Sequence, residues 1–389
     1  MEKKKIAFVV QRYGKEITGG SESHCRSVVE RLADLFEIRV LTTCAKDYWT
    51  WCNAYPAGED RVNGIPVLRF PNRKTRDIAS FNDFSTYIFH HTHTREEELH
   101  WLEEQGPYCP DMIDFIEKEK NAFDLFFFFT YLYYPAYHGI KIVGERSLIQ
   151  PTAHDEPAIL LQIYREMFRA VRGIAFNTPT EETFLRGLFP LDDKHTDCIG
   201  AGVDLPAIQE KERPDTGPYI LYGGRIAAGK GCAELIDFFL RFREEEGNGP
   251  VELVLIGNRE MELPDHPALK CLGFVSEAEK KQLLLSSLFV VIPSPHESLS
   301  LLLLEAFSCR KSVLVNGRCQ VLKDHCLQSN GGLFYENYEE FKECLRFLVN
   351  EKARREAMGD KGYHYAAAHY SWEKVKGKYR HLIRKMMAG

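Results

Sequence analysis

The chain alternates short apolar runs with longer segments of mixed polarity, and this alternation constrains the fold more than any other feature. Short runs that stay apolar are typical of strands covered on both faces, as in parallel sheets. The longer segments Glu22–Leu35, Cys232–Glu244 and Glu277–Leu284 have helical patterns and can supply that cover. The sequence therefore predicts an α/β fold built on parallel sheets. The predicted strands are Ile6–Val10, Ile38–Thr42, Val67–Phe70, Leu125–Thr130, Leu148–Pro151, Gly173–Asn177, Tyr219–Tyr222, Leu253–Ile256, Lys270–Gly273, Leu288–Ile292 and Val313–Asn316.

A polar segment divides these strands into two sets. Val203–Pro218 contains three prolines and the charged run Glu210–Arg213, a composition typical of linkers. The length of 389 residues also exceeds what one hydrophobic core usually holds. We therefore expect two domains, residues 1–204 and 205–370. A last helical segment, 371–389, begins at Ser371, which can serve as its N-cap.

The formal net charge of −6 is shared unevenly. Residues 1–204 hold 24 Lys and Arg against 31 Asp and Glu, a net of −7, and the remainder is at +1. Neither half is basic enough to indicate a nucleic-acid partner. No apolar run is long enough to span a membrane, and Ile6–Val10 is too short for a signal peptide. Eleven cysteines without a CxxC pair favour reduced thiols, so we expect a cytoplasmic protein. At most it touches the inner membrane face peripherally, and the basic cluster Arg69–Arg76 is the local candidate for that contact.

A glycine-rich turn lies between the predicted strand Tyr219–Tyr222 and the helix that begins at Cys232. The turn reads Gly-Gly-Arg-Ile-Ala-Ala-Gly-Lys-Gly over residues 223–231, and it contains Gly224, Arg225 and Lys230. Glycines let backbone N–H groups approach an anion, and a helix N-terminus favours negative charge. Two cations beside them suit a diphosphate. The alternative is an ordinary turn with two exposed cations.

Two glutamates follow the predicted strand Leu288–Ile292. Glu297 lies at the strand-to-helix turn, where ligands of open parallel sheets bind. Glu305 lies eight residues later within an apolar helix, and a carboxylate there needs a partner if it is buried. Sugar hydroxyls are suitable partners. The alternatives are an acidic residue at a helix start for Glu297 and a solvent-facing residue for Glu305.

Two weaker features lie in the first half. Gly19 and Gly20 precede a predicted helix, where a ligand could lie on the backbone, although an ordinary loop with Ser21 as N-cap is the favoured explanation for these residues alone. His154 follows the strand Leu148–Pro151 and would face the domain cleft. Residues 90–93 contain three histidines but no carboxylate or cysteine at ligand spacing, so we interpret them as a helix surface.

These elements, taken in chain order, resemble the retaining glycosyltransferases of family 4. The order is Gly19-Gly20-Ser21-Glu22, His154, Gly224-Arg225 with Lys230-Gly231, and Glu297 with Glu305. Gly200–Asp204 and Leu272–Ser276 add to the match, which covers nearly the whole chain and is best over residues 200–320. The resemblance implies the GT-B fold, in which two Rossmann-like domains face each other across a cleft. It also implies that the last helix crosses back to the first domain.

The resemblance assigns a role to each site residue. Arg225 and Lys230 would bind the donor diphosphate, and Glu297 the transferred sugar. Glu305 would hold the ribose hydroxyls. The implied catalytic residues are Glu297, His154, Lys230 and Arg225. The implied donor-binding residues are Gly19, Gly20, Gly224, Arg225, Lys230, Gly273, Phe274, Val275, Glu297, Ser298, Leu299, Ser300 and Glu305. Ser298, Leu299 and Ser300 depart from the glycine-rich sequence of many relatives.

The function implied is transfer of a hexose from a nucleotide-diphosphate sugar, with retention of configuration. UDP-hexose is favoured and GDP-mannose comes next. The acceptor would be a sugar or a lipid-linked oligosaccharide in bacterial polysaccharide or glycan synthesis. No cofactor or metal is expected, because Asp192 and Asp193 lie far from the glycine-rich turn in sequence and Arg225 and Lys230 can neutralise the diphosphate. The alternatives are a nucleotide-sugar epimerase of the same fold and an inactive homologue that binds sugar nucleotides.

Overall fold

The structure is a computed structural model that describes residues 3–17, 19–206, 218–247 and 249–388. The charged run Glu210–Arg213 of the expected linker lies outside the described residues. The chain divides into two compact units. The first comprises Met1–Ala201 together with Val375–Gly389, and the second comprises Gly202–Lys374.

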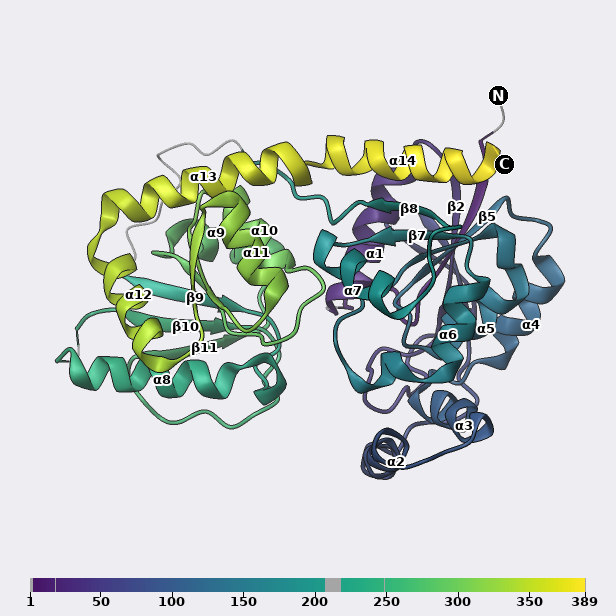
Figure 1. The fold of residues 1–389 in the computed structure, drawn as a ribbon, viewed down its shortest axis with the longest axis horizontal. Helices are drawn as coiled ribbons and strands as arrows, with labels where there is room; N and C mark the ends of the chain where they lie inside the picture. Colours follow the sequence, from purple (N-terminus) through teal and green to yellow (C-terminus); the bar gives the residue numbers. More distant parts are fainter. Residues whose placement is uncertain (1–2, 18, 207–217, 248, 389) are drawn as a thin grey trace. The chain divides into compact units, whose positions relative to one another are not determined.

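The first unit is built on an eight-stranded sheet of order β3-β4-β2-β1-β5-β6-β7-β8 (Figure 1). All neighbours run parallel except β3 and β4, which pair antiparallel. Strand β5, with the sequence Leu-Phe-Phe-Phe-Phe, is buried along its whole length, because helices cover both faces of the sheet. The strands are β1 (Lys5–Val9), β2 (Glu37–Thr43), β3 (Gly58–Val62), β4 (Ile65–Phe70), β5 (Leu125–Phe129), β6 (Ser147–Gln150), β7 (Gly173–Phe176) and β8 (His195–Cys198).

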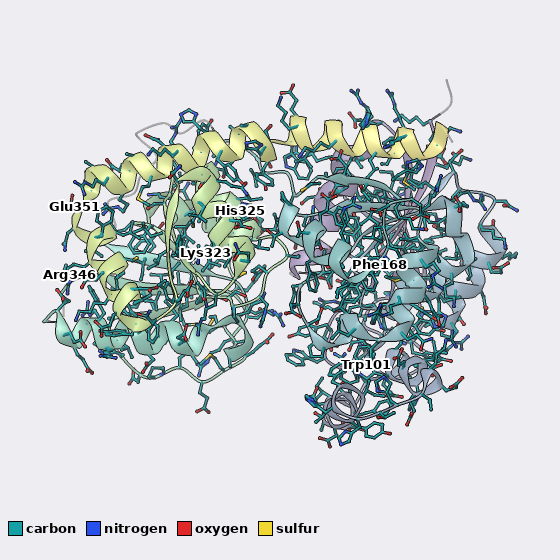
Figure 2. All side chains as sticks on the ribbon, viewed as in Figure 1. Trp101, Phe168, Lys323, His325, Arg346 and Glu351 are labelled. Carbon is teal, nitrogen blue, oxygen red and sulfur yellow. The ribbon has the colours of Figure 1, made fainter. Side chains whose placement is uncertain are left out.

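Local sequence signals fix the ends of several helices around this sheet. Thr94 and Glu97 form a capping box at the start of α3, and α4, α5 and α7 each begin with a proline in the first turn. Trp101 and Phe168, which are buried in the core of this unit, are labelled in Figure 2. The helices are α1 (Gly20–Leu32), α2 (Ile78–His90), α3 (Arg95–Gln105), α4 (Pro110–Glu119), α5 (Tyr134–Val143), α6 (Gln162–Ala170) and α7 (Pro179–Leu188).

The second unit has a six-stranded sheet of order β11-β10-β9-β12-β13-β14, parallel throughout. Its strands are β9 (Tyr219–Gly223), β10 (Glu252–Ile256), β11 (Leu269–Gly273), β12 (Val290–Ile292), β13 (Val313–Asn316) and β14 (Gly332–Tyr335). Its helices are α8 (Cys232–Glu245), α9 (Glu277–Ser286), α10 (Leu301–Ser308), α11 (Gln320–Ser329), α12 (Tyr338–Asn350) and α13 (Lys352–Tyr370). In both sheets the loops after parallel strands leave at one edge, so ligand-binding residues can gather there.

The last helix, α14 (Trp372–Ala388), returns to the first unit as expected. The Tyr379 hydroxyl donates to Gln150 Oε1 at 2.5 Å, and Lys378 Nζ donates to the Cys198 carbonyl at 2.8 Å. Helix α13 ends at Tyr370, so only Ser371 separates the two helices. Ser371 is the C-cap of α13 and forms an isolated bridge with Val203.

Three strands were not predicted from the sequence. Strands β3 and β8 are mostly polar and contain no continuous apolar run, whereas β14 is the short apolar run Gly-Leu-Phe-Tyr, which the prediction left out. The first sheet is consequently mixed, whereas a parallel sheet was predicted. The prediction of a helix surface for residues 90–93 was only partly correct. Helix α2 ends at His90, and His93 Nε2 lies 3.0 Å from Glu98 Oε1.

The basic cluster Arg69–Arg76 is not an open surface patch. Arg69 and Arg76 are buried, and Arg69 pairs with Asp60 at 2.8 Å. Arg73 and Lys74 each pair with a carboxylate of α4 or α3. Two of the four basic side chains are therefore buried, and the other two are ion-paired. Among the described helices, none is long and apolar enough to cross a bilayer.

Candidate functional site

The glycine-rich turn after β9 is a tight structure that requires glycine at defined positions. Gly224 has φ +147°, and its N–H donates to the Ile256 carbonyl at 2.9 Å. Gly231 has φ +75°, and a Cβ there would lie 2.2 Å from the Pro293 carbonyl oxygen. Gly257, which was not predicted as part of the site, has φ +126°, and its Cβ would lie 1.9 Å from the Gly224 carbonyl oxygen. Backbone segments after β9, β10 and β12 thus touch through glycines.

The two cations of this turn have different surroundings. Lys230 Nζ lies 2.8 Å from Glu297 Oε1, and the two side chains are only 28% and 20% exposed. Arg225 is 45% exposed, and its Nη1 lies 3.9 Å from Glu260 Oε2. The Arg225 carbonyl accepts the Tyr222 hydroxyl at 2.6 Å, which fixes the backbone of the turn. The structure therefore brings Lys230 and Glu297 together, although 67 positions separate them in the sequence.

The residues after Glu297 lead directly into α10. The Ser300 hydroxyl accepts the Leu303 N–H at 3.3 Å, so it serves as the helix N-cap. Leu299 and Ser300 are buried. The Ser300 side chain is thus engaged within the protein. Any contact of this segment with an anion would come from Ser298 and from backbone N–H groups.

Glu305 has a partner that the sequence did not reveal. Lys280 Nζ, on α9, lies 2.8 Å from both Glu305 Oε1 and Glu277 Oε2. Burial raises the pKa of Glu305, and the charge of Lys280 acts in the opposite direction. The carboxylate group is 30% exposed, so it can still meet a ligand. No spacing rule links residues 280 and 305, because only the sheet brings α9 and α10 together.

The Gly273–Val275 segment presents an aromatic ring to solvent. Gly273 has φ +68° at the end of β11, and its carbonyl accepts the Gly257 N–H at 2.8 Å. Phe274 is 64% exposed, and its neighbour Leu272 is 51% exposed. Exposed apolar side chains next to the glycine turn are a surface on which a planar ring can stack.

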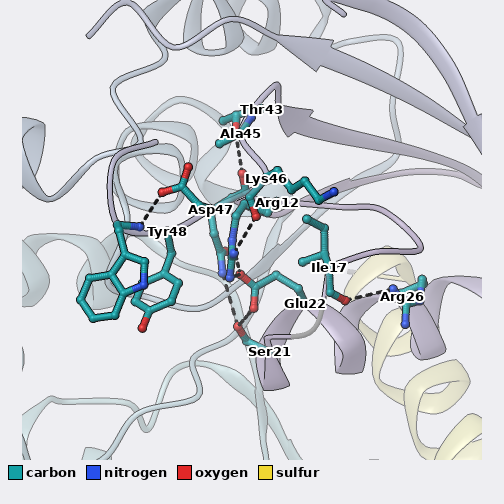
Figure 3. Close-up of polar contacts among 12 residues, drawn as sticks. Arg12, Ile17, Ser21, Glu22, Arg26, Thr43, Ala45, Lys46, Asp47 and Tyr48 are labelled. Carbon is teal, nitrogen blue, oxygen red and sulfur yellow. Dashed lines mark hydrogen bonds and ion pairs between the residues drawn. The ribbon is translucent and has the colours of Figure 1, made fainter. Parts of the chain in front are cut away.

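In the first unit, the start of α1 contains a buried ion pair (Figure 3). Arg12 Nε donates to Glu22 Oε1 at 2.9 Å, and the Ser21 hydroxyl donates to Glu22 Oε2 at 2.8 Å. Gly19 is the N-cap of α1, and a Cβ there would collide with the Glu22 carboxylate at 2.1 Å. Nothing lies within 4 Å of the Cβ position of Gly20, so the backbone at Gly20 is open. The pairing of Arg12 with Glu22 was not predicted, because Arg12 lies outside the Gly19–Glu22 motif and no spacing links the two residues.

His154 lies in the loop after β6, at the edge where ligands bind. Its Nε2 is 3.9 Å from Glu156 Oε1, which accepts the Tyr131 hydroxyl at 2.7 Å. Buried Glu181 holds this loop by accepting the N–H groups of Ala153 and Asn177. Burial raises the pKa of Glu181 to about 8, although both N–H groups act in the opposite direction.

Metal ligands are not grouped within the described ranges, where no set of three His, Cys, Asp or Glu side chains lies close enough to hold an ion. Asp192 and Asp193 lie in the turn before β8, near Arg186 and Lys194 respectively. In the second unit, Arg225, Lys230 and the start of α8 provide positive charge, and Glu297 and Glu305 provide hydroxyl acceptors. This combination is suited to a sugar joined to a diphosphate.

Comparison with known proteins agrees with this chemistry. Residues 206–365 match the family model described as "Glycosyl transferases group 1". Sucrose-phosphate synthase from Thermosynechococcus elongatus superimposes with a TM-score of 0.73 at 15% identity, covering 99% of each chain. Anabaena HepE in complex with UDP and glucose gives 0.68 at 14% identity, over 98% of this chain and 100% of that one. The α,α-trehalose 6-phosphate synthase of Burkholderia multivorans gives 0.68 at 12% identity, over 100% and 99%. The chain therefore has the GT-B fold, and its second unit matches a glycosyltransferase family.

Proposed function

We propose that the protein is a retaining, metal-independent glycosyltransferase that transfers a hexose from a nucleotide-diphosphate sugar. The observation that carries the proposal is the contact between Lys230 and Glu297 beside the glycine turn. This contact lies at the carboxyl edge of the sheet, within the residues that match the glycosyltransferase family. A lysine there can bind a diphosphate, and the glutamate can bind the sugar attached to it.

The leaving group defines what the residues must do. When the bond between sugar and diphosphate breaks, negative charge develops on the diphosphate and positive charge on the sugar. Lys230, Arg225 and the N-terminus of α8 would stabilise the diphosphate without reorganisation. The donor must first displace Glu297 from Lys230. The released carboxylate would then lie next to the transferred sugar.

The nucleoside would occupy the adjoining part of the second unit. Glu305, held by Lys280, would accept the ribose hydroxyls, and Gly273, Phe274 and Val275 would pack against the base. Exposed Phe274 supports this placement, since it leaves an aromatic face open. Ser298, Leu299 and Ser300 would contribute backbone N–H groups. From the first unit, Gly19 and Gly20 would border the diphosphate, and His154 would contact the sugar.

Retention of configuration would follow from attack on the face that the diphosphate leaves. In that geometry the departing phosphate takes the proton of the acceptor hydroxyl. No pair of acid and base carboxylates of the glycosidase type is required. Arg225 and Lys230 would supply the charge that a divalent cation supplies in other enzymes.

UDP-hexose is the favoured donor, and GDP-mannose is the second. The solved structures of Anabaena HepE with UDP, glucose and UDP-glucose support a uridine nucleotide in this fold. The acceptor would be a sugar or a lipid-linked oligosaccharide of polysaccharide or glycan synthesis. The reaction would take place in the cytoplasm, with at most peripheral contact with the inner membrane face.

A thermal-shift screen against UDP, GDP, ADP and TDP sugars tests the donor. A ligand that binds the native state raises the melting temperature, and we expect the largest increase with UDP-glucose. The same donors are then incubated without acceptor. Epimerised nucleotide sugar would indicate the epimerase alternative, and binding without turnover for any acceptor would indicate an inactive homologue. Absence of a shift with every nucleotide sugar would contradict the proposal.

A further inference from the structure

The loop after β2 exposes a tryptophan in a part of the first unit that is otherwise firmly held. Trp49 is 42% exposed, although its neighbour Trp51 is buried. The ring centroid of Trp49 lies 4.5 Å from that of Tyr48, with 32° between the ring planes. The Trp49 ring therefore packs over the Tyr48 ring, and we call this pair of rings the Tyr48–Trp49 platform.

The buried Arg76 and the partly exposed Asp47 hold the backbone of this loop in place. Arg76 donates to the carbonyl oxygens of Tyr48 and Trp49, the latter at 2.9 Å. Asp47 Oδ1 accepts the N–H groups of Trp49 and Thr50, at 2.9 and 2.6 Å. Because these hydrogen bonds hold the loop, the exposure of the Trp49 indole does not result from a mobile backbone. The structure holds this residue in place while leaving 42% of it exposed.

The platform lies beside the polar start of α1. Arg12 Nη1 donates to the Lys46 carbonyl at 3.0 Å, and its guanidinium carbon is 5.3 Å from the centre of the Tyr48 ring. Figure 3 shows Arg12 between Glu22, Lys46 and Tyr48. Strands β1 and β2 pair in parallel, so the loops that follow them leave at the same edge of the sheet. This is the edge at which ligands of such sheets bind.

We propose that the Tyr48–Trp49 platform is a subsite for a pyranose ring of the glycosyl acceptor. An aromatic face packs against the C–H groups of a sugar ring, and the adjacent polar side chains bind its hydroxyls. Asp47 and Ser21, which are partly exposed, supply oxygen atoms, and the buried pair of Arg12 and Glu22 holds Ser21 in place through Glu22 Oε2. The proposal rests on the proposed function, because it takes the ligand of the first unit to be a sugar. Arg76 is then a positioning residue, which corrects its interpretation as part of a membrane-binding cluster.

A sugar fits this surface better than a lipid bilayer does. The charges next to the platform balance, because Glu16 pairs with Lys46 and Arg12 pairs with Glu22, so no excess of positive charge attracts anionic lipid there. The apolar surface consists of two rings and does not continue along an exposed helix face. A single sugar ring needs no larger area.

Sugar binding can be measured without knowledge of the natural acceptor. D-glucose, D-galactose and D-mannose are each added at millimolar concentration to the UDP-saturated protein, and binding is followed by saturation-transfer difference NMR. The indole N–H signals of the four tryptophans are recorded in parallel, and Trp49→Phe identifies the signal of Trp49. We expect at least one hexose to bind and to shift that signal. Trp49→Ala should weaken its binding about tenfold.

The control is Tyr87→Ala, which removes a ring of similar exposure, 38%, near the far end of α2. It should leave hexose binding unchanged, and both variants should keep the melting temperature of the wild type. The inference is overturned if none of the three hexoses binds, or if Trp49→Ala binds them as the wild type does. Loss of binding to phosphatidylglycerol vesicles in Trp49→Ala, without an effect on hexoses, would assign the platform to a membrane. Calorimetry with UDP reports separately on the proposed function, which fails if the wild type binds no nucleotide.

Discussion

Replacement of Lys230 by methionine tests the proposed diphosphate site with little effect on the fold. The ammonium group lies 2.8 Å from Glu297, and both side chains are partly exposed. A pair of this kind contributes about 1 kcal/mol or less to stability. For a domain of this size, we therefore expect the melting temperature to fall by about 2–4 °C.

The effect on nucleotide binding should be much larger. A hydrogen bond between charged groups contributes about 1.5–3 kcal/mol, which corresponds to a factor of about 10–150 in the dissociation constant. In the free protein Lys230 is already paired with Glu297, and this pair must break before the diphosphate binds. The net contribution of Lys230 to UDP binding is therefore smaller than the full value of a charged hydrogen bond. The variant also leaves the Glu297 carboxylate unpaired beside the incoming diphosphate. The pre-existing pair with Glu297 reduces the effect of Lys230→Met on UDP affinity, and repulsion between the unpaired Glu297 and the diphosphate increases it. We therefore expect UDP to bind at least tenfold more weakly.

Isothermal titration calorimetry with UDP provides the measurement, and Lys323→Met provides the control. Lys323 Nζ lies 2.9 Å from Glu336 and is 27% exposed, so it resembles Lys230 in the length of its pair and in its own exposure. Lys323, which lies in the same unit (Figure 2), is on α11. The control should lose the same small amount of stability and bind UDP normally. UDP affinity of Lys230→Met within twofold of the wild type would refute the reasoning.

Three further predictions follow from other contacts. Lys280→Met removes the charge that lowers the pKa of Glu305, so UDP binding should weaken, and more strongly at lower pH, because the carboxyl becomes protonated more readily. Gly231→Ala places a methyl group 2.2 Å from the Pro293 carbonyl oxygen at φ +75°, and should lower the free energy of unfolding by at least about 1–3 kcal/mol in urea titrations. Glu181 has a folded pKa of about 8, so the folded state retains a proton that the unfolded state loses near its usual pKa of 4.5. The free energy of unfolding should therefore fall as the pH rises from about 5 to 8, and Glu181→Gln should flatten this part of the profile.

Each of these three predictions has a control variant or an outcome that would contradict it. Lys281→Met changes the neighbouring exposed lysine, and UDP binding with the same pH dependence in both lysine variants would contradict the role of Lys280. Nothing lies within 4 Å of the Cβ position of Gly229, so Gly229→Ala should be nearly neutral. Equal stability of the two alanine variants would show that the turn relaxes. If the free energy of unfolding of Glu181→Gln depends on pH as that of the wild type does, groups other than Glu181 cause the pH dependence.

The fold could be predicted from the sequence where strands are continuous and apolar. Strands such as β5 are buried on both faces and carry a signal that does not depend on their partners. Strand β3 has three consecutive polar residues, Glu59–Arg61, and is stabilised by pairing with β4, which no local pattern encodes. The return of α14 depends on Tyr379 reaching Gln150, a contact between residues 229 positions apart. It was expected only from a family resemblance.

The glycines of the site could be predicted from the sequence, whereas several of its ion pairs could not. Glycine in a turn between a strand and a helix has a local backbone cause, and the conformations of Gly224 and Gly231 agree with it. The partners of charged side chains depend on which helices the sheet places side by side. Lys280 and the pair of Arg12 with Glu22 were missed for that reason. The cluster Arg69–Arg76 misled in the same way, because sequence alone does not distinguish a buried arginine from a solvated one.

The direct test of the central claim is the configuration of the sugar that the protein releases. UDP-α-glucose is incubated with the protein in excess EDTA, with water as the acceptor, and the released glucose is followed by ¹H NMR before the anomers equilibrate. A retaining, metal-independent transferase should give α-glucose first, and Lys230→Met should slow its release. Initial β-glucose would contradict retention, and release that requires a divalent cation would contradict metal independence. An absence of glucose from UDP-glucose, and of mannose from GDP-mannose, would contradict the proposed activity.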